Sequence, residues 1–181
     1  MSPVATTGSM KSLKDLLVEQ INELHASEMH SEAVLAKVAA SAASPKLAEA
    51  IRGHIDETKQ HLARLDRVFG ELGIKPRKPD AQKAETHGSK GLLEDCASIA
   101  GRTRIEAHVR DAAIIASLQR LEHDEIAGYG CARTWASLLG FTTAASEMLK
   151  TLTEERRFDE ALTRIAETLN KSALEPMAMA R

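Results

Sequence analysis

The sequence predicts an all-α protein built from four long helices, and three observations support this. Apolar residues make up 43% of the 181 residues but aromatic residues only 3%, with Ala and Leu dominating. The β-branched and aromatic runs that strands favour are scarce. Apolar residues also recur at helical spacing over long stretches. A chain of this length can bury one hydrophobic core, so we expect one domain at residues 12–171 with flexible ends at 1–11 and 172–181.

The first two helices are predicted at residues 12–42 and 44–72. Proline disfavours helix at the preceding residue, so Pro45 separates the two segments. Ser44 is then expected to cap the second helix, with Pro45 at its first position. Gly73 follows the last apolar residue of the pattern and marks the end of this helix.

A long connection follows, and it is expected to contain one short helix. Residues 74–90 are polar and basic and include two prolines, which is typical of a loop. The short helix is predicted at 91–101. Two further long helices are predicted at 105–139, ending before Gly140, and at 142–171, with a frayed tail at 172–181.

The lengths of the connections predict the topology. The first and second long helices are joined by a few residues, as are the third and fourth, so each pair should form an antiparallel hairpin. The two hairpins are joined by a crossover of about 30 residues. One long crossover between two hairpins is the pattern of a ferritin-like four-helix bundle.

Charge and cysteine content exclude several classes of function. The net charge of -2 favours neither nucleic acid nor an anionic membrane as partner. Cys96 and Cys131 are too few for a disulfide framework and are expected to be reduced thiols. The first residues do not resemble a secretory signal, and no stretch is apolar enough to span a membrane. We therefore expect a cytoplasmic protein.

Carboxylates interrupt the apolar faces of the predicted helices. Glu28, Glu125 and Glu155 each lie in the middle of an apolar stripe, and Glu57 lies at the edge of one. Each of these residues is close to the midpoint of its helix, and midpoints of antiparallel neighbours lie at similar height. The four carboxylates are therefore expected to converge in the core.

Buried carboxylates need protons, cations or metal ions, because an unpaired buried charge costs several kcal/mol. Carboxylate and imidazole ligands suit iron and manganese, and ferritin-like bundles hold two metal ions in this way. The further candidate ligands lie one turn from the central acids: His61, Asp159 and Glu122. A weak repeat, in which 46–57 aligns with 144–155, suggests that each hairpin supplies half of the site.

Other interpretations remain open at this stage. Arg64 and Arg120 could reach inward, in which case the acids would form a buried salt-bridge network. The basic crossover could instead dock a partner protein, with an acidic core that is only structural.

Four segments resemble a known family. They are Leu24-His25-Ala26-Ser27-Glu28, His54-Ile55-Asp56-Glu57-Thr58, residues 109–116 (VRDAAIIA) and residues 121–130 (LEHDEIAGYG). These are similar to the YciE/YciF family of bacterial ferritin-like stress proteins, and the resemblance runs from about Leu13 to Leu169. It implies a rubrerythrin-like bundle, often dimeric, with a di-iron or di-manganese centre and a link to stress responses.

One departure from the broader ferritin pattern is that Glu-x-x-His is absent from the second and fourth long helices. The sequence offers Glu57-x-x-x-His61 and Glu155-x-x-x-Asp159 instead. We expect two iron or manganese ions, peroxide or dioxygen as substrate, an external reductant and a homodimer. The alternative is a non-enzymatic stress protein that binds or stores metal. The expected ligands are Glu28, Glu57, His61, Glu122, Glu125, Glu155 and Asp159.

Overall fold

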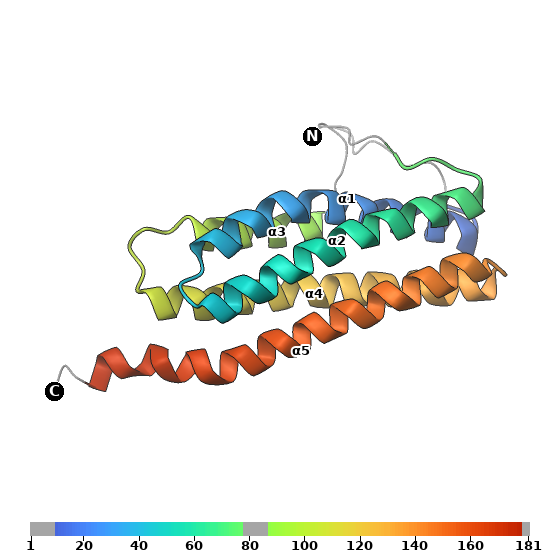
Figure 1. The fold of residues 1–181 in the computed structure, drawn as a ribbon. Helices are drawn as coiled ribbons and strands as arrows, with labels where there is room; N and C mark the ends of the chain where they lie inside the picture. Colours follow the sequence, from blue (N-terminus) through green and yellow to red (C-terminus); the bar gives the residue numbers. More distant parts are fainter. Residues whose placement is uncertain (1–9, 78–86, 179–181) are drawn as a thin grey trace, which may run out of the picture.

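The computed structural model describes residues 10–77 and 87–178, and all regular structure among them is helical. The helices are α1 (Leu13–Ser41), α2 (Pro45–Leu72), α3 (His87–Ala100), α4 (Ala107–Leu138) and α5 (Thr142–Ala178) (Figure 1). Within these residues, no helix is both long and apolar enough to cross a membrane.

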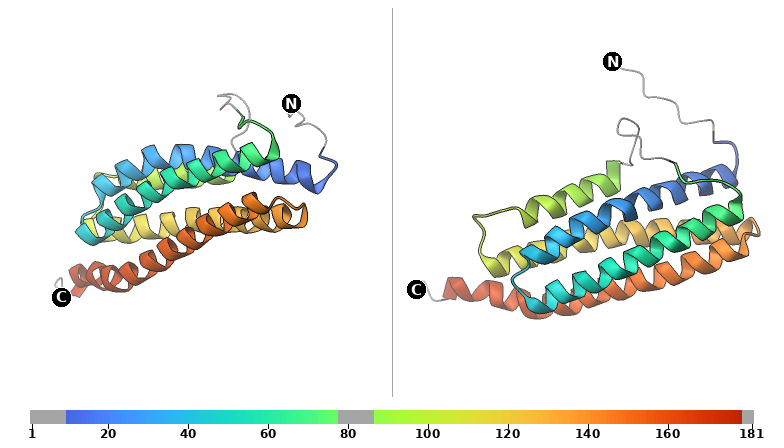
Figure 2. Two further views of the ribbon diagram at one scale, coloured as in Figure 1. Left: turned by 45° about the vertical axis from the view of Figure 1, so that its right-hand side comes forward. Right: turned by 45° about the horizontal axis from the view of Figure 1, so that its top comes forward.

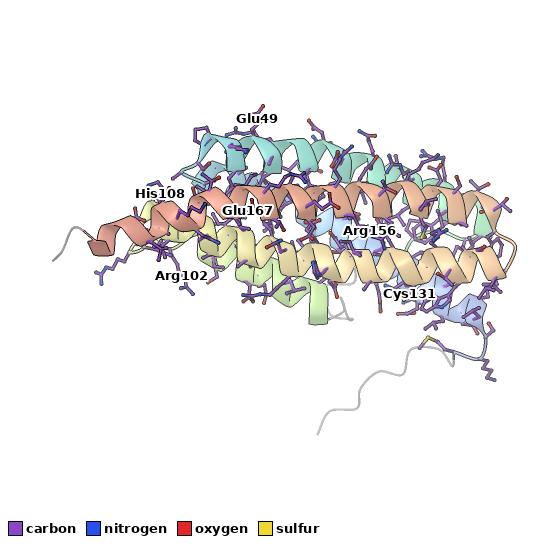
Figure 3. All side chains as sticks on the ribbon, turned by 90° about the horizontal axis from the view of Figure 1, so that it is seen from below. Glu49, Arg102, His108, Cys131, Arg156 and Glu167 are labelled. Carbon is purple, nitrogen blue, oxygen red and sulfur yellow. The ribbon has the colours of Figure 1, made fainter. Side chains whose placement is uncertain are left out.

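Four long helices lie side by side, and the short one covers a seam. α1 contacts α2 and α4, and α5 contacts α2 and α4, so the four form a closed ring of neighbours. α1 and α2 run in opposite directions, as do α4 and α5 (Figures 1 and 2). α3 packs on α1 and α4. Arg156 and Glu167 are exposed on the outer face of α5 (Figure 3).

Local sequence signals explain the ends of the first two helices. Ser12 caps α1, accepting a hydrogen bond from the backbone of Asp15, whose side chain accepts in return from the Ser12 backbone. Ser44 caps α2, as predicted, with Pro45 in its first turn. Gly73 ends α2 with φ of 68°, a left-handed conformation that glycine adopts without strain.

Two acids tie the hairpin ends to neighbouring helices. Asp111 on α4 is fully buried and accepts hydrogen bonds from the backbone N–H groups of Ala43 and Ser44, at 2.9 and 2.7 Å. At the opposite end, Glu71 accepts from the backbone of Thr143 and Ala144. The side chain on one helix thus satisfies the free donors at the start of another, which fixes the heights of the helices.

Two helix boundaries differ from the sequence prediction. α3 begins at His87 rather than at residue 91, so Gly91 is inside the helix. Ser89 donates a hydrogen bond of 2.7 Å to Asp124 on α4, which anchors this additional turn. α5 continues beyond residue 171 to Ala178, and residues 142–175 contain neither glycine nor proline. Most of the basic crossover and of the N-terminal segment predicted to be flexible lies outside the described residues.

The interior consists of two apolar clusters with a polar layer between them. One cluster includes Leu17, Leu24, Phe69 and Leu152, towards the end of the molecule where α2 stops. The other includes Leu35, Ile51, Leu118 and Phe158, towards the opposite end. Along every long helix the switch from one cluster to the other occurs near its middle. The polar layer therefore lies at mid-height.

Candidate metal centre

Five of the predicted ligands meet in the polar layer. They come from all four long helices, and each is at most 2% exposed. They are Glu28 on α1, His61 on α2, Glu122 and Glu125 on α4, and Glu155 on α5. Each lies on the inward stripe of its helix, and the antiparallel packing sets these stripes at the same height.

Glu28, His61 and Glu155 form the first compact group. His61 Nδ1 lies 3.2 Å from Glu28 Oε1 and 3.0 Å from Glu155 Oε1. One ligand atom can be chosen from each residue so that all lie within 4.8 Å of one another. Donors that share one metal ion at about 2.1 Å stand roughly 3 Å apart, so these separations suit a shared ion.

His54, Glu122 and Glu155 form a second group of the same kind. His54 Nε2 lies 3.5 Å from Glu122 Oε1 and 3.6 Å from Glu155 Oε2. The His54 ring stacks on Phe158, with centroids 3.9 Å apart and planes 7° from parallel. This stack holds the imidazole with Nε2 facing the two carboxylates.

Glu155 belongs to both groups. Its Oε1 faces His61 and its Oε2 faces His54, so the carboxylate lies between two imidazoles from successive parts of α2. Neither oxygen accepts a hydrogen bond, and the same is true of both oxygens of Glu122. Buried polar atoms are rarely left without a partner, and each such atom calls for an explanation.

The electrostatics of the layer favour a bound cation. Burial, together with the neighbouring carboxylates, raises the pKa of Glu122 and of Glu125 well above the usual range. Burial opposes ionisation of Glu155 too, but His61 and His54 outweigh it and lower its pKa. Burial alone would lower the pKa of His61, yet contacts with Glu155 and Glu28 raise it to about 11. A positive charge close to these clustered carboxylates therefore stabilises their ionised forms.

Side chains around the candidate ligands fix their orientation. The Nε2 of His61 lies 3.0 Å from Glu154 Oε2, and Arg64 Nη2 donates to Glu154 Oε1 at 2.8 Å. Ser27 donates to Glu125 Oε1 at 2.8 Å. A histidine that offers one nitrogen to a metal and the other to a carboxylate is the usual arrangement in metal sites.

Three predicted ligands lie outside both groups: Glu125 is buried in the polar layer, whereas Glu57 and Asp159 lie at its margin. Glu57 is at the margin of the buried face of α2 and pairs with the exposed Arg157. Its Oε2 still comes within 3.6 Å of His54 Nδ1. Asp159 accepts a hydrogen bond from Gln119 at 3.1 Å and lies 3.4 Å from His123. The structure therefore places both acids at the edge of the polar layer.

His54 and Glu154 also belong to this region, although neither was among the predicted ligands. His54 is 3% exposed and lies inside the layer. The spacing could have indicated this position, because His54 precedes His61 by seven residues and residues seven apart share a helix face. Glu154 is partly buried, and its partners His61 and Arg64, which are distant in sequence, hold it against the layer.

The salt-bridge alternative accounts for one part of this region only. Arg64 pairs with Glu154, and Arg120 lies 3.8 Å from the exposed Asp95. Among the ion pairs of residues 10–77 and 87–178, none joins a Lys or Arg to Glu28, Glu122, Glu125 or Glu155. The donor set of carboxylates and imidazoles, with orphaned oxygens on Glu122 and Glu155, fits iron or manganese.

A hollow of about 290 Å³ reaches the layer from outside. It lies between α1, α4 and the start of α3, and Glu125 forms part of its wall beside Gly128 and Cys131. A side chain at Gly128 would meet Leu24, since an added Cβ would lie 2.9 Å from Leu24 Cδ2. The close packing of α1 on α4 at this point therefore requires glycine at position 128.

The chain is an all-helical protein with a buried layer of carboxylates and imidazoles. Comparison with known sequences identifies the family to which it belongs. Residues 12–175 match the family described as a domain of unknown function, DUF892. The chain belongs to this family, and the resemblance to YciE/YciF proteins is confirmed. Protein YciF of Escherichia coli strain K12 is 34% identical over 167 residues, covering 91% of this chain and 97% of YciF.

Solved structures support the same assignment. The crystal structure of the E. coli stress protein YciF matches with a TM-score of 0.82 at 31% identity, covering 90% of this chain and 99% of that one. A ferritin-like diiron-carboxylate protein from Bacillus anthracis matches with a TM-score of 0.62 at 17% identity, covering 87% and 99%. The second likeness is one of fold alone.

Proposed function

We propose that this chain is a di-metal carboxylate protein of stress defence that reacts with peroxide or dioxygen. In this proposal the long helices form a ferritin-like four-helix bundle, and iron or manganese occupies the polar layer. Glu28 and His61 hold one ion, His54 and Glu122 hold the other, and Glu155 serves both. The diiron description of the Bacillus anthracis structure and the stress-protein description of YciF support this combination.

The position of Glu155 carries the proposal. It is fully buried, contributes one oxygen to each group, and pairs with no Lys or Arg side chain of the described residues. An ionised carboxylate in this setting is unfavourable by several kcal/mol unless a cation compensates it. A pair of ions would satisfy Glu155 and Glu122 together.

The residues around the site have separate roles in such a reaction. The bound metal pair would supply the electrons that reduce the oxidant. Tyr129 holds a proton at its phenol oxygen and donates it in a hydrogen bond to Glu28. The two apolar clusters exclude bulk water from above and below, and the hollow beside Glu125 offers a route of entry.

The test is metal content, measured by elemental analysis on protein produced with added iron and manganese. We expect about two ions per chain in the wild type and a clear loss in Glu155→Gln. Glu160→Gln on the same helix is the matched control, because Glu160 is exposed. Peroxide and dioxygen consumption by the loaded protein then tests the reaction.

Each outcome has a clear meaning. A wild type that retains no metal, with Glu155→Gln at least as stable, would show that the acids are structural. Two bound ions without turnover of either oxidant would favour metal binding or storage without catalysis.

A further inference from the structure

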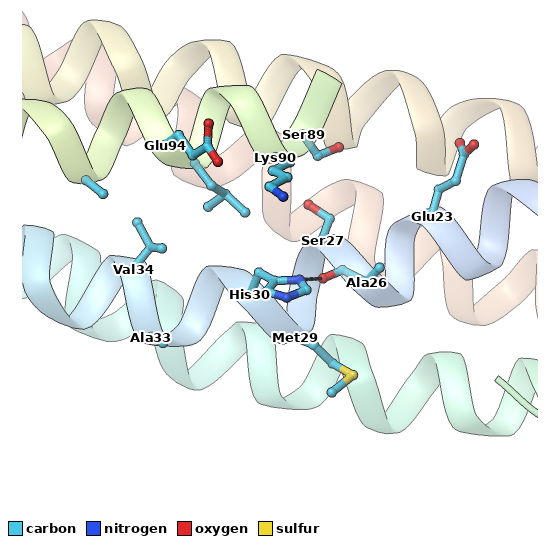
Figure 4. A pocket seen from close by; sticks show the side chains of 12 residues that line it. Glu23, Ala26, Ser27, Met29, His30, Ala33, Val34, Ser89, Lys90 and Glu94 are labelled. Carbon is cyan, nitrogen blue, oxygen red and sulfur yellow. Dashed lines mark hydrogen bonds between the residues drawn. The ribbon is translucent and has the colours of Figure 1, made fainter. Parts of the chain in front are cut away.

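A separate pocket of about 310 Å³ lies between α1 and α3 (Figure 4). Much of its wall is apolar, including Ala33 and Val34 from α1 and Leu93 and Ala97 from α3. Its volume falls at the lower end of the range for small-molecule sites, which are concave and mainly apolar. It is therefore large enough for a molecule of one or two rings.

Ser27 places one polar group in this apolar wall. The side chain is 5% exposed and points from α1 towards α3 (Figure 4). Its hydroxyl proton is directed to Glu125 Oε1, 2.8 Å away, so the oxygen retains lone pairs for another donor. A ligand that donates to Ser27 would thus be one side chain away from the polar layer.

The charges around the pocket disfavour an anion. Glu23 and Glu94 contribute two carboxylates to its lining and Lys90 one ammonium group. His30, on the same wall, directs Nδ1 to the Ala26 carbonyl oxygen at 2.7 Å. A charged ligand would also lose its hydration against the apolar walls, which is costly for either sign. An uncharged ligand with at least one hydroxyl group meets all of these conditions.

We propose that this pocket binds a small, uncharged phenol whose hydroxyl group donates a hydrogen bond to Ser27. The apolar ring would pack between α1 and α3, and the hydroxyl group would face the side of the pocket nearest Glu125. Binding follows from the pocket alone and needs no metal.

The choice of a phenol rather than another alcohol rests on the proposed function. A peroxide-reducing centre needs an electron donor, and a hydroquinone provides two electrons and two protons as its two O–H bonds break to give a quinone. Hydrogen peroxide takes up the same two electrons and two protons as its O–O bond breaks to give two waters. The pocket would hold this donor next to Ser27 and Glu125.

Calorimetric titration of the metal-free full chain with 2-naphthol tests the binding. We expect saturable binding at one site, weaker by about two- to tenfold in Ser27→Ala, the range for one neutral hydrogen bond. Naphthalene, which lacks the hydroxyl group, should bind equally to both proteins. The anion 6-hydroxy-2-naphthoate should bind the wild type more weakly than 2-naphthol does.

A pocket-filling variant gives an independent check. Ala33 is exposed and lines the pocket, so Ala33→Phe should weaken 2-naphthol binding by about tenfold or more without disturbing the core. Ala40→Phe is the control, because Ala40 is exposed on the same helix and is not part of the lining. Metal content should be the same in both variants.

The possible results separate this proposal from the one above. Binding of 2-naphthol to a chain that retains no metal supports the pocket and removes only its link to the metal centre. No binding to the wild type, or equal binding to Ala33→Phe and Ala40→Phe, overturns the proposal. A dimer that dissociates in Ala33→Phe, with no 2-naphthol binding, would show that the pocket is a contact between two copies of the chain.

Discussion

The phenol oxygen of Tyr129 donates a hydrogen bond of 2.6 Å to Glu28 Oε1, and each residue is 1% exposed. Burial, reinforced by the nearby carboxylates, raises the pKa of Tyr129 well above its usual value, so the phenol keeps its proton. The same Glu28 oxygen lies 3.2 Å from His61 Nδ1. Tyr129 therefore fixes the position of a candidate ligand through the same oxygen that faces His61.

Tyr129→Phe should destabilise the metal-free protein while leaving metal binding largely intact. The variant keeps the ring packing but leaves Glu28 with one fewer donor, a loss of about 1–2 kcal/mol in unfolding free energy. Urea unfolding of the metal-free protein measures it, alongside metal content. An unchanged unfolding free energy would contradict the role assigned to this hydrogen bond.

Asp111→Asn should destabilise the fold at a site far from the candidate ligands. Asp111 accepts from the backbone of both Ala43 and Ser44, and an amide group can accept only at its oxygen. One of these two backbone N–H groups then faces the NH2 group of the new side chain. We therefore expect a loss of about 1–3 kcal/mol in unfolding free energy. Asp95→Asn, at an exposed position, should change it by less than about 0.5 kcal/mol.

Local signals made most of the fold predictable. Ser44, Pro45 and Gly73 act within a few residues of their own position, and the structure confirms each as a helix boundary. The same holds for the central acids Glu28 and Glu155, whose burial follows from the periodicity of a single helix. The additional turn of α3 was not predictable in this way, because it depends on the contact between Ser89 and Asp124.

The choice between neighbouring side chains on α2 could not be made from the sequence. His54 and Glu57 are three residues apart, so their directions differ by about 60° around the helix. Which of them faces the layer depends on the rotation of α2, and this is set by packing against α5. The stack of His54 on Phe158 fixes that rotation, and it joins residues about a hundred positions apart.

Glu57→Gln and Asp159→Asn should therefore retain two metal ions, whereas His54→Gln should lose one. The sequence pattern favours Glu57 and Asp159 as ligands, but the two compact groups contain His54 instead. Elemental analysis of the three variants, prepared in parallel, distinguishes these ligand sets. Loss of metal from Glu57→Gln with full retention in His54→Gln would restore the ligand set expected from sequence.

The metal-free protein should become less dependent on His61 as the pH rises. The pKa of His61 is raised from 6.5 to about 11, so its protonation favours the folded state fully below pH 6.5 and is lost on approaching pH 11. The difference in unfolding free energy between wild type and His61→Gln should shrink by about 2–3 kcal/mol from pH 7 to pH 9. His108→Gln, at an exposed position, is the control and should show no such trend. A constant difference for His61→Gln would show that His61 is already neutral in the folded protein.

Glu154→Gln should weaken metal binding without removing a candidate ligand. Glu154 faces the Nε2 of His61 and is held by Arg64, whose contacts lower the pKa of Glu154 although burial opposes this. Loss of the negative charge would make His61 a weaker metal ligand and would allow its ring to rotate. Outer partners of this kind typically change metal affinity by about 10- to 100-fold. Competition with a chelator measures the affinity, and Glu167→Gln, exposed on the same helix, is the control.

The metal affinity of Arg64→Lys should lie between those of Glu154→Gln and Glu167→Gln, because lysine keeps the charge but loses the paired contact with Glu154. Equal affinities for Glu154→Gln and Glu167→Gln would mean that His61 is oriented by its packing alone.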